Sequence, residues 1–234
     1  MIPWLDGPSF PAVDSALSEP NGLLAVGGEL SPDWLLAAYR RGIFPWYSSD
    51  QPILWWSPDP RLVLVPAKMR ITRSLRKTLR RHRFDVRFDT AFREVVAACA
   101  APREPDLGTW ITDEMQDAYL RLHELGYAHS VESWVGDELV GGLYGIALGR
   151  AFFGESMFSR KTDASKAALA HLAHYLQQQD FAVIDCQMTT SHLLSLGAEE
   201  MSRRDFCAGL AAWTREDGAP QRWAYEAVAE VFLK

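Results

Sequence analysis

Three apolar runs between residues 129 and 158 constrain the fold more than any other feature of the sequence. They read HSVESW, LVGGLYGIAL and AFFGESMF, and the short segments VGDE and GR separate them. Apolar runs joined by such short, turn-forming connections favour antiparallel strands. The sequence therefore predicts a meander of three antiparallel strands in this region.

A helix and a further strand are expected directly after the meander. The segment DASKAALAHLAHYLQQQ places leucines at positions 169, 172 and 176, which form one apolar stripe on a helix. The run FAVIDCQ, residues 181–187, then has the composition of a buried strand. A strand, a helix and a strand in this order favour a right-handed crossover between parallel strands. The predicted fold is therefore α/β (α+β) with a mixed sheet.

Local signals predict several shorter elements. Ser31 followed by Pro32 begins a helix that ends before Gly42, and Thr112 caps a helix that ends before Gly126. Other helices are expected in ITRSLRKTLRRH, TAFREVVAACA, TTSHLLSLGA and RRDFCAGLAAWT, and a strand in FDVRFD.

The first sixty residues are rich in proline, glycine and tryptophan. Prolines in Phe44–Tyr47 and Trp55–Pro58 interrupt regular structure, so loops are expected there. The tryptophans of these segments should pack against a neighbouring element or line a pocket. Because the composition becomes basic after Pro60, we predict a small N-terminal domain over residues 1–60 and a larger domain over residues 61–234.

Charge is distributed unevenly along the chain. The net charge is −6, yet every charged residue between positions 61 and 83 is basic. This basic strip, defined as the Lys and Arg residues of 61–83, is typical of a surface that docks a phosphate backbone, and a solvated helix face is the alternative. The candidate phosphate contacts are Arg70, Arg73, Arg76, Lys77, Arg80 and Arg81.

Targeting and membrane signals are not found in the sequence. The N-terminus lacks a basic region followed by an apolar run, and no stretch approaches the ~18 apolar residues of a membrane span. The three cysteines form no CxxC pair, so neither a disulfide framework nor a zinc site is expected. A cytoplasmic protein without a metal site is the expectation.

The end of the FAVIDCQ strand carries two polar side chains. Residues two apart on a strand share a face, so Asp185 and Gln187 are expected to point one way and Cys186 the other, into the core. A carboxylate and an amide at the end of a buried strand are candidates for a site. An ordinary polar strand end is the alternative.

A second candidate carboxylate, Glu155, lies in the run FFGESMFS. Alternation along a strand predicts that Phe153, Glu155 and Met157 share a face. A carboxylate among aromatic residues can anchor a cationic group, and a salt bridge at a strand end is the alternative. The six histidines show no pairing with a nucleophile, and most are expected on helix surfaces.

The order of the elements resembles the N-acetyltransferase (GNAT) fold, in which an antiparallel meander precedes a crossover helix and a parallel strand. Acetyl-CoA enzymes of that fold hold the pyrophosphate in a glycine-containing loop before the crossover helix. Here SRKTDASK occupies that place and contains no glycine. The glycines of GGLYGIALG are better explained by close backbone approach within the sheet. Acetyl-CoA is therefore not the expected donor.

A closer resemblance covers the chain from about Pro20 to Arg204 and is to the leucyl/phenylalanyl-tRNA–protein transferases. It rests on the ordered strings PNGLLAVGGELSPDWLLAAYRRGIFPW, ILWWSPDPR, GTWIT, HSVESW, LVGGLYG, FFGESMFS, ASKAAL, IDCQ and SLGA. The resemblance implies a small N-terminal domain and a GNAT-like domain. It also implies transfer of leucine or phenylalanine, and less well methionine, from leucyl-tRNA or phenylalanyl-tRNA to acceptor proteins with an N-terminal Arg or Lys, which are then degraded. A cytoplasmic monomer that needs no metal and no CoA is expected.

The resemblance also implies roles for individual residues. Gln187 would contact the reacting α-amine, Asp185 would orient Gln187, and Glu155 would anchor the amine or its basic side chain. The apolar pocket for the transferred side chain would be formed by Leu143, Phe153, Met157 and Ile184. The aromatic residues that would hold the terminal adenosine and the ester are Trp46, Trp110, Tyr39 and Tyr119, with packing between domains as the alternative for the two tyrosines.

Two other functions are compatible with parts of the sequence. A CoA-dependent N-acetyltransferase is disfavoured by the missing pyrophosphate loop, and acetyl-CoA binding would test it. A non-catalytic RNA-binding module would account for the basic strip and the tryptophans. Such a module should be insensitive to substitution of Asp185 and Gln187.

Overall fold

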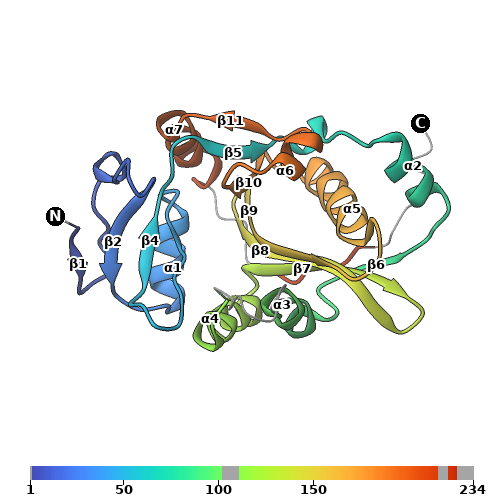
Figure 1. The fold of residues 1–234 in the computed structure, drawn as a ribbon, viewed down its shortest axis with the longest axis horizontal. Helices are drawn as coiled ribbons and strands as arrows, with labels where there is room; N and C mark the ends of the chain where they lie inside the picture. The colour runs from blue at the N-terminus through green and yellow to red at the C-terminus, as the bar shows by residue number, and fades with distance from the viewer. Residues whose placement is uncertain (1, 102–110, 216–220, 226–234) are drawn as a thin grey trace.

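The computed structural model describes residues 2–101, 111–215 and 221–225, and two sheets organise this part of the chain (Figure 1). The smaller sheet contains, in spatial order, β1 (Trp4–Leu5), β2 (Leu23–Gly27), β4 (Leu54–Trp56) and β3 (Phe44–Pro45). The larger sheet contains, in spatial order, β11 (Glu199–Met201), β5 (Arg61–Leu64), β10 (Val183–Gln187), β9 (Ala151–Ser159), β8 (Glu138–Leu148), β7 (Ala128–Val135) and β6 (Asp85–Phe88).

The larger sheet contains the predicted meander and crossover. β7, β8 and β9 pair antiparallel in sequence order. After helix α5 (Ala164–Gln178), β10 returns parallel to β9 and pairs antiparallel with β5 on its other side. The predicted α/β fold with a mixed sheet is therefore confirmed, and the order of elements is the one that the GNAT resemblance implied.

The remaining helices begin and end close to the predicted positions. They are α1 (Pro32–Tyr39), α2 (Arg73–Arg80), α3 (Phe92–Ala100), α4 (Asp113–Glu124), α6 (Ser191–Ser195) and α7 (Arg203–Trp213), with 3-10 turns at Val13–Ser15 and Pro66–Lys68. The hydroxyl of Thr112 accepts the backbone N–H of Met115 at the start of α4, as a capping residue should. No helix in the described ranges combines the length and the apolar character that crossing a bilayer requires.

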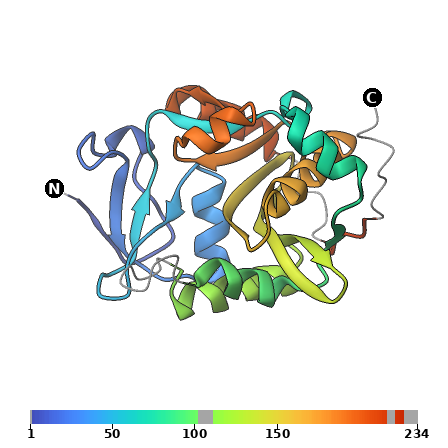
Figure 2. The ribbon, with the colours of Figure 1, turned by 45° about the vertical axis from the view of Figure 1, so that its right-hand side comes forward.

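Helices cover both faces of the larger sheet. α5 lies on one face, and α3 and α4 lie on the other (Figure 1). α1 stands between the smaller sheet and the larger one (Figure 2). Its last residue, Tyr39, packs against Phe153 of β9 with ring centroids 5.1 Å apart. The domain division at residue 60 stays a prediction.

The tryptophan-rich segments are more regular than expected. The prediction of loops at Phe44–Tyr47 and Trp55–Pro58 is wrong in part, because β3 and β4 pair there. β3 is an edge strand, where a proline removes no needed hydrogen bond. The ring of Trp55 is completely buried and its Nε1 donates to the Gly27 carbonyl, 2.8 Å away. Packing rather than exposure therefore accounts for this residue.

Three of the six histidines are buried, contrary to the prediction that most lie on helix surfaces. One of them, His129, belongs to a buried group that we call the Asp89 cluster. His129 Nδ1 lies 2.8 Å from Asp89 Oδ2, and its ring stacks on Trp223 with centroids 3.8 Å apart. Asp89 also accepts the backbone N–H groups of Ser130 (2.9 Å) and Trp223 (2.8 Å). The cluster fastens the residues around Trp223 to the larger sheet.

Candidate active site

Two β-bulges lie side by side in the centre of the larger sheet. Between β8 and β9, Tyr144 pairs with Ser156 but Gly145 pairs with Gly154, so Glu155 is an extra residue. Gly145 leaves no room for a side chain, because a Cβ there would meet the backbone of β9. A bulge changes the direction of the side chains on either side of it.

The second bulge is on β10. Asp185 pairs with Val63 of β5 but Gln187 pairs with Leu62, so Cys186 is the extra residue. The same strand pairs with β9 on its other side, where Asp185 lies beside Phe153. The two irregular residues are thus neighbours across the β9–β10 pair.

The bulge on β9 breaks the predicted alternation of its side chains. Phe153 and Met157 do not share a face: Met157 faces α5, whereas Phe153 packs against Tyr39 on the opposite side. The structure places Phe152, which the sequence analysis did not select, in the cavity wall instead of Phe153. The position of a bulge depends on how neighbouring strands pair, and no local pattern in AFFGESMF indicated one.

An apolar cavity opens beside the bulges, between the sheet and α5. The space inside it that is open to the centre of a water-sized sphere is about 120 Å³, which is smaller than the ~300–1,000 Å³ of pockets for drug-sized ligands. Three residues predicted for an apolar pocket, Leu143, Met157 and Ile184, do line it. The other apolar residues of the wall are Phe152, Leu169, Leu172 and Leu193.

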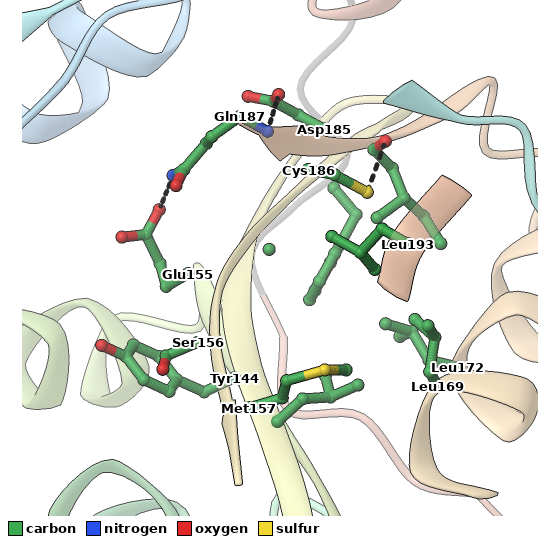
Figure 3. A pocket seen from close by; sticks show the side chains of 14 residues that line it. Tyr144, Glu155, Ser156, Met157, Leu169, Leu172, Asp185, Cys186, Gln187 and Leu193 are labelled. Atoms are coloured by element: carbon green, nitrogen blue, oxygen red, sulfur yellow. Dashed lines mark hydrogen bonds between the residues drawn. The ribbon is translucent and has the colours of Figure 1, made fainter. Parts of the chain in front are cut away.

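The polar end of this cavity is formed by Gln187, Glu155 and Asp185 (Figure 3). The side-chain Nε2 of Gln187 donates to Glu155 Oε1 over 2.9 Å. Asp185 accepts the backbone N–H of Gln187, also over 2.9 Å, and so fixes its backbone rather than its amide. Gln187 has a φ of +60°, a left-handed conformation that non-glycine residues seldom adopt. The pair predicted from the strand end does meet, but through the backbone of Gln187.

Glu155 has two further donors beneath the cavity. The hydroxyl of Tyr39 lies 2.8 Å from Oε1 and that of Tyr119 lies 2.6 Å from Oε2, while the two hydroxyls are 2.9 Å apart. Three contacts need three hydrogens, and the two hydroxyls supply two. The ring of hydrogen bonds is therefore complete only when Glu155 carries a proton.

Burial explains how Glu155 can hold that proton. Only 7% of the residue is exposed, and burial raises the pKa of its carboxyl from 4.5 to about 7, although hydrogen bonds from Tyr119, Tyr39 and Gln187 oppose the rise. The same burial, together with the nearby Glu155 charge, raises the pKa of Tyr39 and Tyr119 well above 10. Near neutral pH the carboxyl can therefore gain or lose a proton, while both tyrosines keep theirs.

The aromatic residues predicted to hold the terminal adenosine and the ester differ in their exposure to solvent. Tyr39 and Tyr119 are fully buried and present no surface on which a base could stack. Trp46, 40% exposed, borders a wider cleft that shares Glu155 and Gln187 with the apolar cavity. Trp110 lies outside the described residues.

Cys186 packs against the core, as predicted, and also lines the cavity. Burial raises the pKa of its thiol far above the ordinary value, which disfavours a thiolate nucleophile. Arg61 differs from what the sequence indicated. Arg61, the first residue of the basic strip, is only 1% exposed and forms an ion pair with Asp185 of 2.6 Å. It is a site residue that the sequence analysis missed.

The rest of the basic strip lies at the surface. α2 lies beside α5 (Figure 1) and packs against it through Leu75 and Leu79. All the candidate phosphate contacts are exposed except Arg76, which is half-buried.

Comparison with known proteins agrees with the family resemblance found in the sequence. The model of the family described as leucyl/phenylalanyl-tRNA protein transferase matches residues 63–211, and that of the N-terminal domain of the same family matches residues 28–59. A leucyl/phenylalanyl-tRNA–protein transferase from Aromatoleum aromaticum is 74% identical and covers 99% of this chain and 98% of its own. One from Azoarcus sp. is 72% identical over 98% of each chain.

Solved structures are more distant. A GCN5-related N-acetyltransferase from Kribbella flavida shares 11% identity, with a TM-score of 0.35 over 73% of this chain and 61% of that one. The matched family models define the chain as a transferase. It belongs, more particularly, to the leucyl/phenylalanyl-tRNA–protein transferase family.

Proposed function

We propose that the protein transfers leucine or phenylalanine, and less well methionine, from aminoacyl-tRNA to acceptor proteins with an N-terminal Arg or Lys, marking them for degradation. The observation that carries this proposal is an apolar cavity whose mouth holds the Gln187–Glu155 pair. The family match supplies the tRNA ester as donor, and the cavity supplies a place for its side chain.

The cavity accounts for selection of the transferred residue. Leu143, Phe152, Met157 and Ile184 form an apolar wall, and we propose that this wall admits an unbranched Cβ followed by apolar bulk. A misfit methyl group in such a pocket changes binding by about 1–3 kcal/mol. Isoleucine and valine, branched at Cβ, should therefore be transferred poorly.

The reaction is the aminolysis of an ester. The acceptor nitrogen attacks the carbonyl carbon, the bond to the ribose 3′ oxygen breaks, and the proton lost by nitrogen ends on that oxygen. The donor is already activated, so the enzyme mainly positions the amine against the ester and needs neither a metal nor CoA. An α-amine has a pKa of about 7.7–8, so a fraction is already neutral at pH 7.

Gln187 and Glu155 are placed to handle the amine. The amide of Gln187 donates to Glu155, which leaves its carbonyl oxygen to accept a hydrogen bond from the amine. Ionised Glu155 would take the first proton from the cationic amine, which leaves the neutral nucleophile and completes the ring with Tyr39 and Tyr119. The second proton, lost on attack, ends on the ribose oxygen. The negative charge of Glu155 would attract the cationic form of the acceptor before reaction.

The exposed basic strip supports binding of the tRNA backbone, and Trp46 at the wider cleft supports contact with the terminal adenosine. We extend the proposal to a monomer that acts in the cytoplasm, where charged tRNA is found.

The test uses purified protein, tRNA charged with labelled leucine, and two peptides that differ only in starting with Arg or Ala. Label on the Arg peptide alone, without ATP or CoA, is the expected result. Absence of transfer to either peptide while tRNA still binds would favour the RNA-binding module.

A further inference from the structure

Arg61 is a buried cation that the steps above do not use. It is the first residue of β5, and its guanidinium makes a two-point contact with Asp185: Nε to Oδ1 at 2.8 Å and Nη2 to Oδ2 at 2.6 Å. Asp185 is itself completely buried. An ion pair shielded from water on both sides is costly to break from one side, because the remaining charge stays buried.

Three parts of the chain hold this guanidinium in place. Its Nη1 donates to the carbonyl of Gly42 over 3.1 Å. The rings of Phe44, on β3, and Phe206, on α7, each lie 4.8 Å from the guanidinium carbon. A planar cation fits between aromatic rings while keeping its in-plane N–H groups for other partners. The position of Arg61 is therefore set independently of Asp185.

Asp185 connects Arg61 to the backbone of Gln187. The oxygen that accepts Arg61 Nε, Oδ1, also accepts the backbone N–H of Gln187. Gln187 is held in the left-handed conformation that sends its side chain to Glu155 (Figure 3). Such a conformation persists only where surrounding contacts determine it.

We propose that Arg61 is a positioning residue of the transfer reaction: through Asp185 it holds Gln187 in the backbone conformation that directs its amide to Glu155 and the cavity. The proposal rests on the transfer activity proposed above. Lysine cannot replace Arg61, because a single ammonium cannot meet both oxygens of Asp185 and the Gly42 carbonyl in one plane.

The experiment measures kcat and KM for leucyl-tRNA and for an Arg-starting peptide in Arg61→Lys, Asp185→Asn and the double variant. Arg61→Lys should lower kcat by about 100-fold, the effect of a small misplacement of a reacting group, with KM for leucyl-tRNA little changed. Since both residues act through Gln187, the double variant should lose no more kcat than the worse single variant.

Asp89→Asn is the matched control, because it disturbs a buried carboxylate that follows β6 and does not line the cavity. It should lower stability and leave kcat intact. If Arg61→Lys fails to fold, Phe206→Leu removes one ring from the guanidinium and keeps the ion pair. It should lower kcat in the same sense, by about tenfold.

Normal kcat in a folded Arg61→Lys or Phe206→Leu variant would overturn the proposal. So would losses that multiply in the double variant, since they indicate independent effects. Wild-type protein runs in the same assay. If it transfers no leucine, the proposed function fails, whereas active wild type with fully active variants defeats only the role of Arg61.

Discussion

Two carboxylates with buried surroundings, Asp89 and Glu155, differ in the kind of donor around them. Asp89 is held by two backbone N–H groups and by His129. Glu155 is held by two tyrosine hydroxyls and by the amide of Gln187. Backbone donors are fixed by the strands that carry them, whereas a hydroxyl can rotate its hydrogen to another acceptor.

The clusters also differ in their access to a ligand. Glu155 and Gln187 line the apolar cavity and the wider cleft, whereas neither of these openings is lined by Asp89. The comparison indicates that burial alone does not identify a reactive carboxylate. A carboxylate with movable donors beside a cavity can exchange a proton, and one with fixed donors ties the chain together.

The largest effect is expected from Gln187→Ala. It removes the group proposed to contact the amine and leaves Asp185 and Arg61 in place, so kcat should fall by about 10²–10³-fold. Transfer to a saturating Arg-starting peptide measures it, and the unfolding midpoint in urea should stay near that of wild type. A near-normal kcat would mean that Gln187 has no part in the reaction.

Glu155→Gln should change how stability depends on pH. The folded pKa of Glu155, about 7, exceeds its usual 4.5, so the folded state holds the proton more tightly than the unfolded state. Stability from this group is complete below pH 4.5 and is lost as pH rises toward 7, by about 3 kcal/mol. In urea unfolding across this range, the loss should appear as a change in the difference between wild type and the variant.

Because His171 also has a shifted pKa, the stability of wild type must be compared with that of Glu155→Gln at each pH. Burial, with His174 and His82 nearby, lowers the pKa of His171 to about 4, so its contribution to stability grows from pH 4 to 6.5 and opposes that of Glu155. Both proteins contain His171, so the difference between them isolates Glu155. A difference that stays constant with pH would contradict the raised pKa.

Asp89→Asn tests the other half of the comparison. In the variant, an amide nitrogen takes the place of one carboxylate oxygen and faces the backbone N–H that this oxygen accepted. A buried group left without a hydrogen-bond partner costs about 1–3 kcal/mol. We expect the free energy of unfolding to fall by that amount while kcat is kept. Loss of kcat without loss of stability would mean that the two clusters are not separate in function.

The smallest effect is expected at the surface. Arg73→Ala on α2 should weaken tRNA binding slightly and reduce the slope of log K against log salt by about 0.7–0.9, the value for one phosphate contact. Filter binding at several salt concentrations measures it. Arg204→Ala, an exposed arginine on α7, is the control and should leave the slope unchanged.

The sequence was sufficient where structure depends on near neighbours. Apolar runs, turn residues, helical periodicity and helix caps predicted the meander, the crossover to β10 and most helices. The bulges at Glu155 and Cys186 were not predictable, because they depend on which residues pair across strands. Arg61 was misassigned for the same reason: its partner lies 124 positions away, and nearby sequence shows only other basic residues.

The surroundings of Arg61 also bear on the order of synthesis. Gly42 and Phe44 leave the ribosome early, Asp185 much later, and Phe206 later still. A nascent chain that ends before α7 lacks one of the two rings that contact the guanidinium, and so leaves Gln187 without its full support. Full support of Gln187 is thereby linked to completion of nearly the whole polypeptide, so that a product truncated before α7 would contain the donor pocket and Gln187 but would lack the Phe206 ring.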